Sequence, residues 1–274
     1  MQKQLSVVSL NMFGTPFHPK HIVTTFLRND VRKRFIAIAE IIYDLNADVL
    51  LLQEIHDYPH LIFLKRLLPK FPHVAYKHML YGPRGGIVIF SKYPLDPAHY
   101  YDFLSKGKIH NKSITGHLSL KGILQVKIKG TDIWLANTHL TQNSDHDFSA
   151  TNRYVPILVS QLKQISIHTK AMKDRNEQVI LGGDFNMPKE TEYYKDFLKM
   201  TGLRDAFPRD FFTTYHQSFL PEGDKIGRVD YIFTSNEIKP QRTSYILRKP
   251  LKDDSGNPFF PSDHMGLVAT FTIS

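Results

Sequence analysis

The sequence contains no cysteine, a single tryptophan and no long hydrophobic run. The absence of cysteine excludes disulfide bonds, thiol nucleophiles and thiolate zinc sites, so any bound metal must use oxygen or imidazole ligands. The longest apolar runs, Val49–Leu52 and Gly86–Phe90, have the length of strands, well short of the roughly 18 residues of a membrane-spanning helix. We therefore expect no transmembrane segment.

We also expect no signal peptide. The apolar stretch Leu5–Leu10 is too short for the core of one, and no small-residue cleavage site follows it, so we interpret it as a strand. Chains without cysteine occur both in the reducing cytosol and outside the cell. The localisation is therefore unknown, and both a cytoplasmic and a secreted protein remain open.

Acidic residues are outnumbered by basic ones. The chain has 26 Asp and Glu against 35 Lys and Arg, which gives a formal net charge of +9. This excess favours anionic partners such as nucleic acid, phosphorylated metabolites or acidic lipid surfaces. The remaining composition, 274 residues with 42% hydrophobic and 22% charged, is that of an ordinary globular protein and excludes disordered, collagen-like and coiled-coil classes.

Strand-like apolar runs recur along the whole chain. The expected strands are Leu5–Leu10, Val49–Leu52, Ile87–Phe90, Ile123–Ile128, Ile133–Ala136, Val179–Leu181, Val229–Phe233 and Leu267–Ile273. The expected helices are Val31–Leu45 with Asn46 as its C-terminal cap, Leu61–Leu68, Asn152–Met172 and Glu190–Met200. No Gly/Ser- or Pro-rich linker divides the chain, so we expect one α/β domain over residues 1–274, with packed sheets and outer helices.

Polar side chains stand at the ends of six of these strands. They are Asn11, Glu54, His139, Asp184 with Asn186, Asp230, and Asp263 with His264. Taken singly, each has an ordinary interpretation as a turn former, a solvated charge, an ion pair or a hydrogen-bonded histidine. Taken together they need another explanation, because carboxylates placed directly after buried apolar runs are costly unless they are paired or bound to metal. The set therefore indicates a shared metal-dependent site.

A hard divalent cation such as magnesium fits this set. Such an ion needs only one or two protein carboxylates and keeps its other positions for water and for phosphate oxygens of a substrate. Glu54, with Asn11 beside it, meets that demand.

The remaining polar residues suit hydrolysis of a phosphoester. A histidine that is oriented by a carboxylate acts as a general base for water, so Asp230 holding His264 would generate the nucleophile. Asn186 and His139 could stabilise the charge that develops on a pentacovalent phosphate.

These motifs, in this order, resemble the endonuclease/exonuclease/phosphatase superfamily, which has the fold of deoxyribonuclease I. The motifs are Ser-Leu-Asn11, Leu-Gln-Glu54, Asn-Thr-His139, Gly-Asp184-Phe-Asn186, Asp230-Tyr-Ile and Ser-Asp263-His264. They run from residue 9 to the C-terminal strand. The resemblance implies a four-layer α/β/β/α sandwich with a magnesium-dependent phosphoester hydrolase site at one end; manganese or another divalent cation is an alternative.

The resemblance also implies a role for each residue of the set. Asn11, Glu54 and Asp263 would bind the metal, Asp184 and Asn186 would position water and phosphate, Asp230 would pair with His264, and His139 would stabilise the transition state.

The substrate branch is narrowed by further resemblances. Asn-Thr-His139 is similar to the deoxyribonuclease I and sphingomyelinase branches, whereas the abasic-site endonuclease branch lacks this histidine. The acidic partner that deoxyribonuclease I has for the histidine is missing from Gly82–Gly86. Gly85–Leu95 and Lys121–Ile128 are similar to neutral sphingomyelinases, which favours a choline-phospholipid substrate. His216 departs from the sphingomyelinase pattern, which usually has Thr-Tyr-Asp-Pro here, and leaves headgroup recognition open.

Nucleic acid and small phosphoesters such as phosphoinositides remain the alternative substrates. We thus expect an anionic phosphoester, presented on a phospholipid surface or in nucleic acid, as the partner of a monomer. Five cations near the last motif form either an anion-binding rim or a solvated loop: Lys239, Arg242, Arg248, Lys249 and Lys252.

Two other features have alternative interpretations. Phe259 and Phe260 could form a membrane-inserting tip, but we favour an aromatic pair buried beside the site. A zinc site made of His56, His60, His139 and His146 lacks any supporting spacing. A non-catalytic adaptor would explain the positive charge but not the complete set of acids, amides and histidines.

Overall fold

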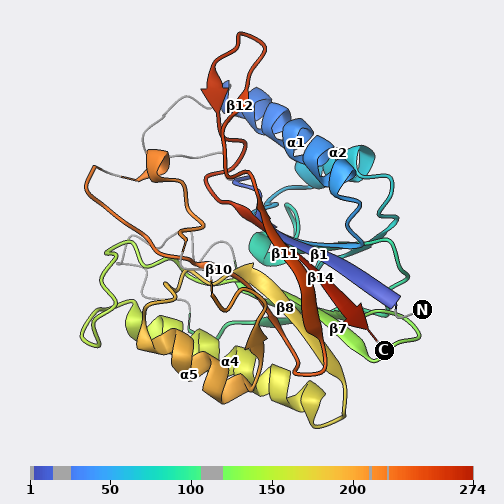
Figure 1. The fold of residues 1–274 in the computed structure, drawn as a ribbon, viewed down its shortest axis with the longest axis vertical. Helices are drawn as coiled ribbons and strands as arrows, with labels where there is room; N and C mark the ends of the chain where they lie inside the picture. The colour runs from blue at the N-terminus through green and yellow to red at the C-terminus, as the bar shows by residue number, and fades with distance from the viewer. Residues whose placement is uncertain (1–2, 15–25, 106–119, 210–211, 221, 274) are drawn as a thin grey trace.

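Two six-stranded sheets lie face to face in the centre of the protein (Figure 1). The computed structural model describes residues 3–14, 26–105, 120–209, 212–220 and 222–273. The first sheet contains, in spatial order, β11 (Lys239–Ile246), β14 (Gly266–Ile273), β1 (Lys3–Asn11), β2 (Val49–Gln53), β4 (Val88–Ser91) and β3 (His73–Ala75). The second contains β5 (His99–Asp102), β6 (Gly122–Lys127), β7 (Ile133–His139), β8 (Gln178–Asp184), β10 (Asp230–Thr234) and β9 (Arg204–Asp205).

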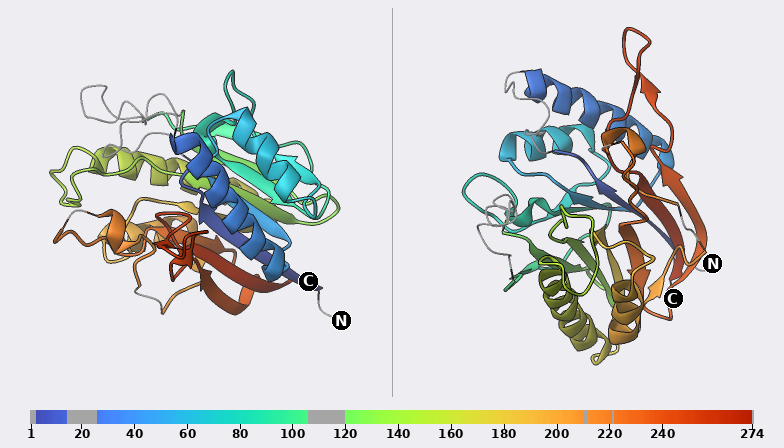
Figure 2. Two further views of the ribbon diagram at one scale, coloured as in Figure 1. Left: turned by 90° about the horizontal axis from the view of Figure 1, so that it is seen from above. Right: turned by 90° about the vertical axis from the view of Figure 1, so that its left-hand side faces the viewer.

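Helices cover the outer face of each sheet. Apolar residues of α1 (Phe26–Leu45) and α2 (Tyr58–Leu67) pack on the first sheet, and those of α4 (Val155–Lys173) and α5 (Glu192–Thr201) pack on the second. Figure 2 shows the two helical layers on opposite sides of the paired sheets. The expected four-layer α/β/β/α sandwich is confirmed. Within the described residues, no helix is long and apolar enough to cross a bilayer.

The core follows from the two-residue period of the strands. On β1, Val7 faces the second sheet, where it joins a cluster with Leu135 and Ile180, while Val8 faces outward to meet Phe35 of α1. Both faces of the central strands are therefore buried, which is why these strands appear in the sequence as continuous apolar runs.

A buried pair of amides joins the two sheets below one end of the sandwich. Gln53 Nε2, at the end of β2, donates to Asn137 Oδ1 of β7 at 2.8 Å. Asn137 Nδ2 in turn donates to the carbonyls of Leu52 and Val88 at 2.8 and 3.0 Å. Because buried amides are costly without partners, this arrangement favours one alignment of the two sheets.

All the expected strands and helices form, and several strands extend to the polar residues that follow the apolar runs. Asn46 has the left-handed backbone expected of a helix C-cap. The sequence pattern missed the strands with little apolar content: β3, β5, β9, β11, and the hairpin of β12 (Leu251–Lys252) and β13 (Pro258–Phe259). Short 3-10 turns occupy Arg84–Gly86 and Gln217–Phe219.

Of the two interpretations of the five cations, a single rim beside the last motif is wrong, because two of the cations lie far from it on β11. Lys239 and Arg242 lie at the start of β11, where they pair with Thr272 and Thr270 of β14. The other end of β11, at Ile246, pairs with Gly266 beside the last motif. At about 3.3 Å per residue, Lys239 and Arg242 thus lie roughly 23 Å and roughly 13 Å along the strand from Ile246.

Candidate active site

The polar residues predicted from the strand ends gather at one end of the sandwich. Parallel pairing of β1 with β2, and of β7 with β8, brings the carboxyl ends of each pair to the same edge. His139 pairs with Asp184 across β7 and β8, and Asp184 pairs with Asp230 across β8 and β10. Asn11 reaches across the two sheets, with its Nδ2 3.1 Å from Asp184 Oδ2. The sequence therefore identified a set of residues that the fold does bring together.

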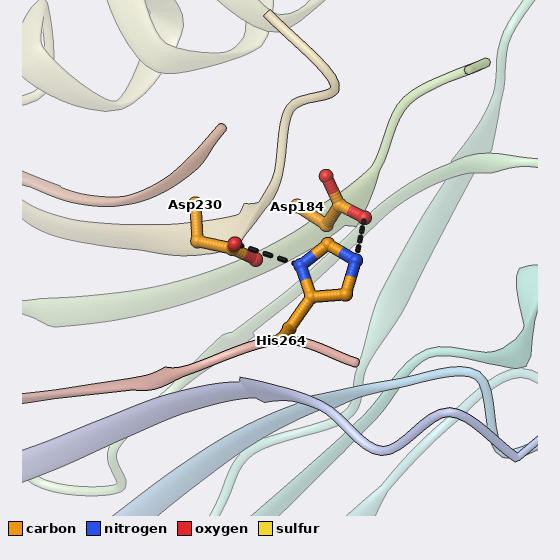
Figure 3. A group of neighbouring side chains, drawn as sticks. All are labelled: Asp184, Asp230 and His264. Atoms are coloured by element: carbon orange, nitrogen blue, oxygen red, sulfur yellow. Dashed lines mark hydrogen bonds and ion pairs between the residues drawn. The ribbon is translucent and has the colours of Figure 1, made fainter. Parts of the chain in front are cut away.

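His264 lies between two buried aspartates (Figure 3). Its Nδ1 is 2.8 Å from Asp230 Oδ2, so the predicted pair is present. Its Nε2 lies 3.7 Å from Asp184 Oδ2. Burial disfavours the charged imidazole, but Asp230, Asp184 and Asp263 together raise the pKa of His264 well above its ordinary value. Asp230 can thus orient the ring while Nε2 faces the site.

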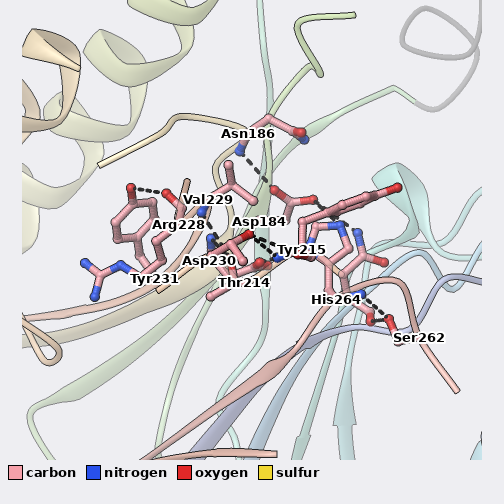
Figure 4. A network of polar contacts seen from close by, with 12 residues as sticks. Asp184, Asn186, Thr214, Tyr215, Arg228, Val229, Asp230, Tyr231, Ser262 and His264 are labelled. Carbon is pink, nitrogen blue, oxygen red and sulfur yellow. Dashed lines mark hydrogen bonds and ion pairs between the residues drawn. The ribbon is translucent and has the colours of Figure 1, made fainter. Parts of the chain in front are cut away.

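The segment that contains Thr214 and Tyr215 holds the Asp230–His264 pair in place (Figure 4). Thr214 Oγ1 accepts hydrogen bonds from the backbone N–H groups of Val229 and Asp230, both at 3.1 Å. Tyr215 forms an isolated bridge with His264, and the two rings meet edge to face at 4.9 Å. These contacts fix the start of β10 against the histidine.

Asp184 is the central carboxylate of the site. It follows Gly183, whose φ of +149° and close approach to β7 exclude a side chain, because a Cβ there would be 2.0 Å from the Thr138 carbonyl oxygen. Burial raises the pKa of Asp184 to about 7; Asp230 adds to the rise, while His264 and Lys121 oppose it. The carboxylate is therefore easily protonated unless positive charge is close.

His139 and Asn186 face the same space as Asp184. His139 Nε2 is 3.4 Å from Asp184 Oδ2, and burial, followed by the charge of Lys121, lowers the pKa of His139 well below its ordinary value. Asn186 has a left-handed backbone at φ +46° and donates from Nδ2 to the Leu140 carbonyl at 3.0 Å. A neutral imidazole and an amide here can donate hydrogen bonds to a phosphate oxygen.

Glu54 and Asp263 form the carboxylate side of the site. Glu54 has the left-handed backbone (φ +62°) that is unusual outside glycine and is typical of functional sites. Burial raises the pKa of Asp263 to about 6 against the lowering effect of His264, and the charge of Glu54 adds to the rise. Asp263 Oδ1 is buried without a hydrogen-bond partner in the described part of the chain. Two adjacent carboxylates with an unsatisfied oxygen fit a divalent cation.

Asn11 lies beside these carboxylates but presents its amide nitrogen. Its Nδ2 donates to Glu54 Oε1 at 3.2 Å, and its Oδ1 accepts from the Phe13 N–H at 3.0 Å. In this orientation Asn11 bridges Glu54 to Asp184, and its role as a metal ligand stays a prediction.

Asp184, Asp230 and His264 also bring ligand atoms within 4.8 Å of one another. A hard cation prefers oxygen ligands, so the Glu54 and Asp263 side suits such a cation better than this hydrogen-bonded trio does.

The four-histidine zinc hypothesis has no support in the described residues. His60 Nδ1 lies 2.9 Å from Asp57 at the start of α2, and His146 Nδ1 lies 3.5 Å from Asp224. Each of these histidines is thus engaged by its own carboxylate, and they do not gather around His139.

Two site residues were missed by sequence analysis. Lys121 is partly buried and donates from Nζ to the Leu140 carbonyl at 2.6 Å; desolvation lowers its pKa to about 8, against the charges of Asp184 and Glu54. Burial also lowers the pKa of His56, which lies near Glu54. Lys121 begins a segment noted above and His56 was considered there only as a zinc ligand, but only the folded loops reveal that both lie partly buried beside the site.

Phe260 of the predicted aromatic pair contacts His216, the residue that departs from the sphingomyelinase pattern. Phe260 is partly buried and stacks on the His216 ring at 3.8 Å. Burial, aided by His264, lowers the pKa of His216 to about 4. The apex of the β12–β13 hairpin, which projects past α1 in Figure 1, is instead the polar segment Asp253–Asn257. The interpretation of a partly buried pair therefore fits better than a membrane-inserting tip.

A cavity of about 300 Å³ adjoins the site at Asn186. Its walls include Asn143, His146, Phe148, Glu190 and Lys225.

Known proteins share this fold and part of this sequence. The chain is 25% identical over 284 residues to a putative neutral sphingomyelinase of Drosophila melanogaster, across 98% of this chain and 61% of that protein. It is 28% identical over 180 residues to a phospholipase C of Staphylococcus aureus, across 61% of this chain and 52% of that protein. The chain therefore spans less than two thirds of the length of these relatives.

Solved structures match over nearly the whole chain. SmcL has a TM-score of 0.73 at 23% identity, covering 98% of this chain and 99% of that one. TDP2 from C. elegans has a TM-score of 0.68 at 21% identity, covering 98% and 75%. A beta toxin variant from Staphylococcus aureus with bound magnesium ions has a TM-score of 0.67 at 21% identity, covering 99% and 100%. At these identities the likeness concerns the fold.

A family profile supplies the assignment. Residues 8–264, which include all eight predicted site residues, match the Endonuclease/Exonuclease/phosphatase family. The chain belongs to the Endonuclease/Exonuclease/phosphatase family.

Proposed function

We propose that this chain is a magnesium-dependent phosphodiesterase that hydrolyses a choline phospholipid of the sphingomyelin type. The observation that supports this most is the buried Asp230–His264 pair at 2.8 Å, set beside two carboxylates suited to a cation. A phosphodiester hydrolase needs both a base for water and positive charge at the phosphate.

The residues of the chain divide the reaction between them. Asp230 accepts the Nδ1 hydrogen of His264, and Nε2, in the deprotonated imidazole, would take a proton from the attacking water while the ester oxygen leaves the phosphorus. Asp184 and Asn186 position that water and the phosphate. His139 donates a hydrogen bond to a phosphate oxygen as negative charge develops there.

Glu54 and Asp263, with Asn11 beside them, would hold the divalent cation. When bound, the cation would withdraw charge from a phosphate oxygen. The bound magnesium in the related beta toxin structure is consistent with this assignment.

The lipid substrate is favoured by the relatives. The Drosophila protein that matches over 98% of this chain is named a putative neutral sphingomyelinase, and the Staphylococcus aureus relative is a phospholipase C. The cavity beside Asn186 offers space for the group on one side of the phosphate. The likeness to TDP2 concerns the fold alone, so nucleic acid is an outcome of the test.

A substrate panel tests the proposal. The purified chain with magnesium is assayed against sphingomyelin vesicles, a phosphoinositide, plasmid DNA and RNA, with Glu54→Gln as the variant that should lose activity while staying folded. Turnover of sphingomyelin that is lost in Glu54→Gln supports the proposal. Turnover of DNA or RNA alone would replace the substrate, and a fully active Glu54→Gln at limiting magnesium would remove the metal assignment.

A further inference from the structure

The turn Met79–Gly82 exposes two large apolar side chains. Leu80 is 80% exposed and Tyr81 is 70% exposed. Single exposed apolar residues are common, but two in succession at the apex of one turn form a small patch with no packing role.

Several hydrogen bonds hold this turn in place. Met79 N–H donates to the Gly82 carbonyl at 3.1 Å, and Tyr58 N–H donates to the Tyr81 carbonyl at 3.0 Å. The Tyr58 hydroxyl donates to the Met79 carbonyl at 2.7 Å. The backbone of the turn is therefore fixed, and the two side chains are displayed to solvent by a defined structure.

The turn packs against His56 and Asp57, the residues that follow Glu54 of the candidate active site. Gly82 packs so closely on the residues after Glu54 that a Cβ on it would lie 2.4 Å from the His56 carbonyl oxygen and 2.6 Å from Asp57 Cα. The apex thus stands only a few residues from a carboxylate assigned to the cation.

A third exposed apolar residue lies on a loop that is tied to this turn. Arg84, just after the turn, makes two hydrogen bonds to the Asp102 carboxylate at 2.8 and 2.9 Å. Two residues beyond Asp102 is Leu104, which is 88% exposed. The ion pair therefore ties the turn to a second loop that carries an exposed apolar side chain.

We infer that the Leu80–Tyr81 turn is a membrane-contact element that inserts into the interface of a phospholipid bilayer. The inference rests on the proposed function, since a lipid phosphodiesterase must bring its site to a membrane surface. The turn is convex, which suits insertion between headgroups better than it suits a ligand pocket. Tyrosine, with an apolar ring and a polar tip, is favoured at such interfaces.

The positive charge of the protein is consistent with a phospholipid bilayer as the partner. Lys77, at the base of the turn, is exposed, and the chain has a net charge of +9. Basic residues near a membrane are attracted to anionic lipids, while the apolar side chains contribute by leaving water.

The test is vesicle binding by Leu80→Ser combined with Tyr81→Ser. Vesicles of sphingomyelin, phosphatidylcholine and phosphatidylserine are sedimented with the protein in a chelator, so that no hydrolysis occurs. We expect the double variant to bind roughly tenfold or more weakly than the unmodified chain, because two partly inserted side chains are lost. Hydrolysis of soluble bis(p-nitrophenyl) phosphate with magnesium should stay unchanged.

Ile167→Ser is the matched control. Ile167 is 65% exposed but lies on α4, which packs on the second sheet, so this variant should bind vesicles normally. Equal binding by the double variant and the unmodified chain would overturn the inference and would point to contact with another protein as the role of the turn. An unmodified chain that does not bind vesicles at all would also overturn the inference.

The inference and the proposed function fail separately. Vesicle binding that depends on the turn, in a chain that hydrolyses no phospholipid, would support the membrane contact and contradict the function. Hydrolysis of sphingomyelin in detergent micelles, with vesicle binding that does not depend on the turn, would support the proposed function and contradict the membrane contact.

Discussion

Asp184 and Asp263 differ from ordinary carboxylic acids because burial raises their pKa values, to about 7 and about 6. A raised pKa in the folded state means that the folded protein binds these protons more tightly than the unfolded chain does. Their contribution to stability is therefore present at low pH and is lost as the pH rises from about 4 through about 7. The raised pKa of His264 acts in the same direction at higher pH.

The loss of stability with rising pH predicts how magnesium and pH together affect the melting temperature. In a chelator, the melting temperature should fall between about pH 5 and about pH 8, and magnesium should raise it more at the higher pH, where the carboxylates are ionised. Thermal unfolding with and without magnesium at both pH values measures this. Asp184→Asn should flatten the pH dependence; an equal effect of magnesium at both pH values would contradict the assignment.

The Asp230–His264 pair leads to a second prediction. Asp230→Asn should slow hydrolysis by roughly 10²–10⁴-fold, because the neutral amide no longer orients and stabilises the imidazole. It should also shift the pH–rate profile, since Asp230 helps to raise the pKa of His264. Steady-state rates across pH provide the measurement. Asp132→Asn, which removes an exposed partner of Lys127 just before β7, at the opposite end of that strand from His139, serves as the control and should keep the unmodified rate and profile.

At the level of elements, the strands that could be predicted are those buried on both faces. Their apolar runs are continuous, and the functional residues come directly after them, so the sequence located both. β11 could not be found in this way, because its first six residues are exposed and none of them is a large apolar residue. Lys121 was missed because nothing next to it in the sequence signals that the loops of the site would bury it.

The Thr214 segment was also beyond sequence analysis, since its partners are far away in the chain. Thr214 Oγ1 accepts from two buried N–H groups at the start of β10. We predict that Thr214→Val destabilises the protein by about 1–3 kcal/mol, because both donors are left unsatisfied, and that it also slows hydrolysis by displacing Asp230. Urea unfolding and activity assays measure the two effects. Thr213→Val, one residue earlier, should cost less; equal losses would argue against the special role of Thr214.

At the scale of the whole molecule, the positive charge is distributed unequally with respect to the site. Arg248 follows β11 at its site end, with its guanidinium 5.3 Å from the ring centroid of Phe212, and Lys249 is the next residue. Lys239 and Arg242 lie at the other end of the same strand.

Two double variants with the same charge change test which end matters. Arg248→Ala with Lys249→Ala should weaken binding to anionic vesicles and reduce its salt dependence, whereas Lys239→Ala with Arg242→Ala should have little effect. Sedimentation with vesicles at several salt concentrations compares them. Equal losses in both variants would mean that net charge, and not its position, governs membrane binding.

We propose that residues 1–274 form one domain. The central hydrophobic cluster supports this, because it contains strands from both halves of the sequence, from Leu5 of β1 to Ile273 of β14. Neither sheet could bury its inner face without the other.

The amide pair of Gln53 and Asn137 has a consequence for how substrates can change within this architecture. Gln53 is next to Glu54, and Asn137 is two residues before His139, so this pair fixes the position of Glu54 relative to His139 from inside the sandwich. Its hydrogen bonds involve none of the surrounding loops. The loops at the rim can therefore vary in length and sequence without moving the reacting groups. New substrates can be acquired by altering the entrance, while the hydrolytic step is inherited unchanged.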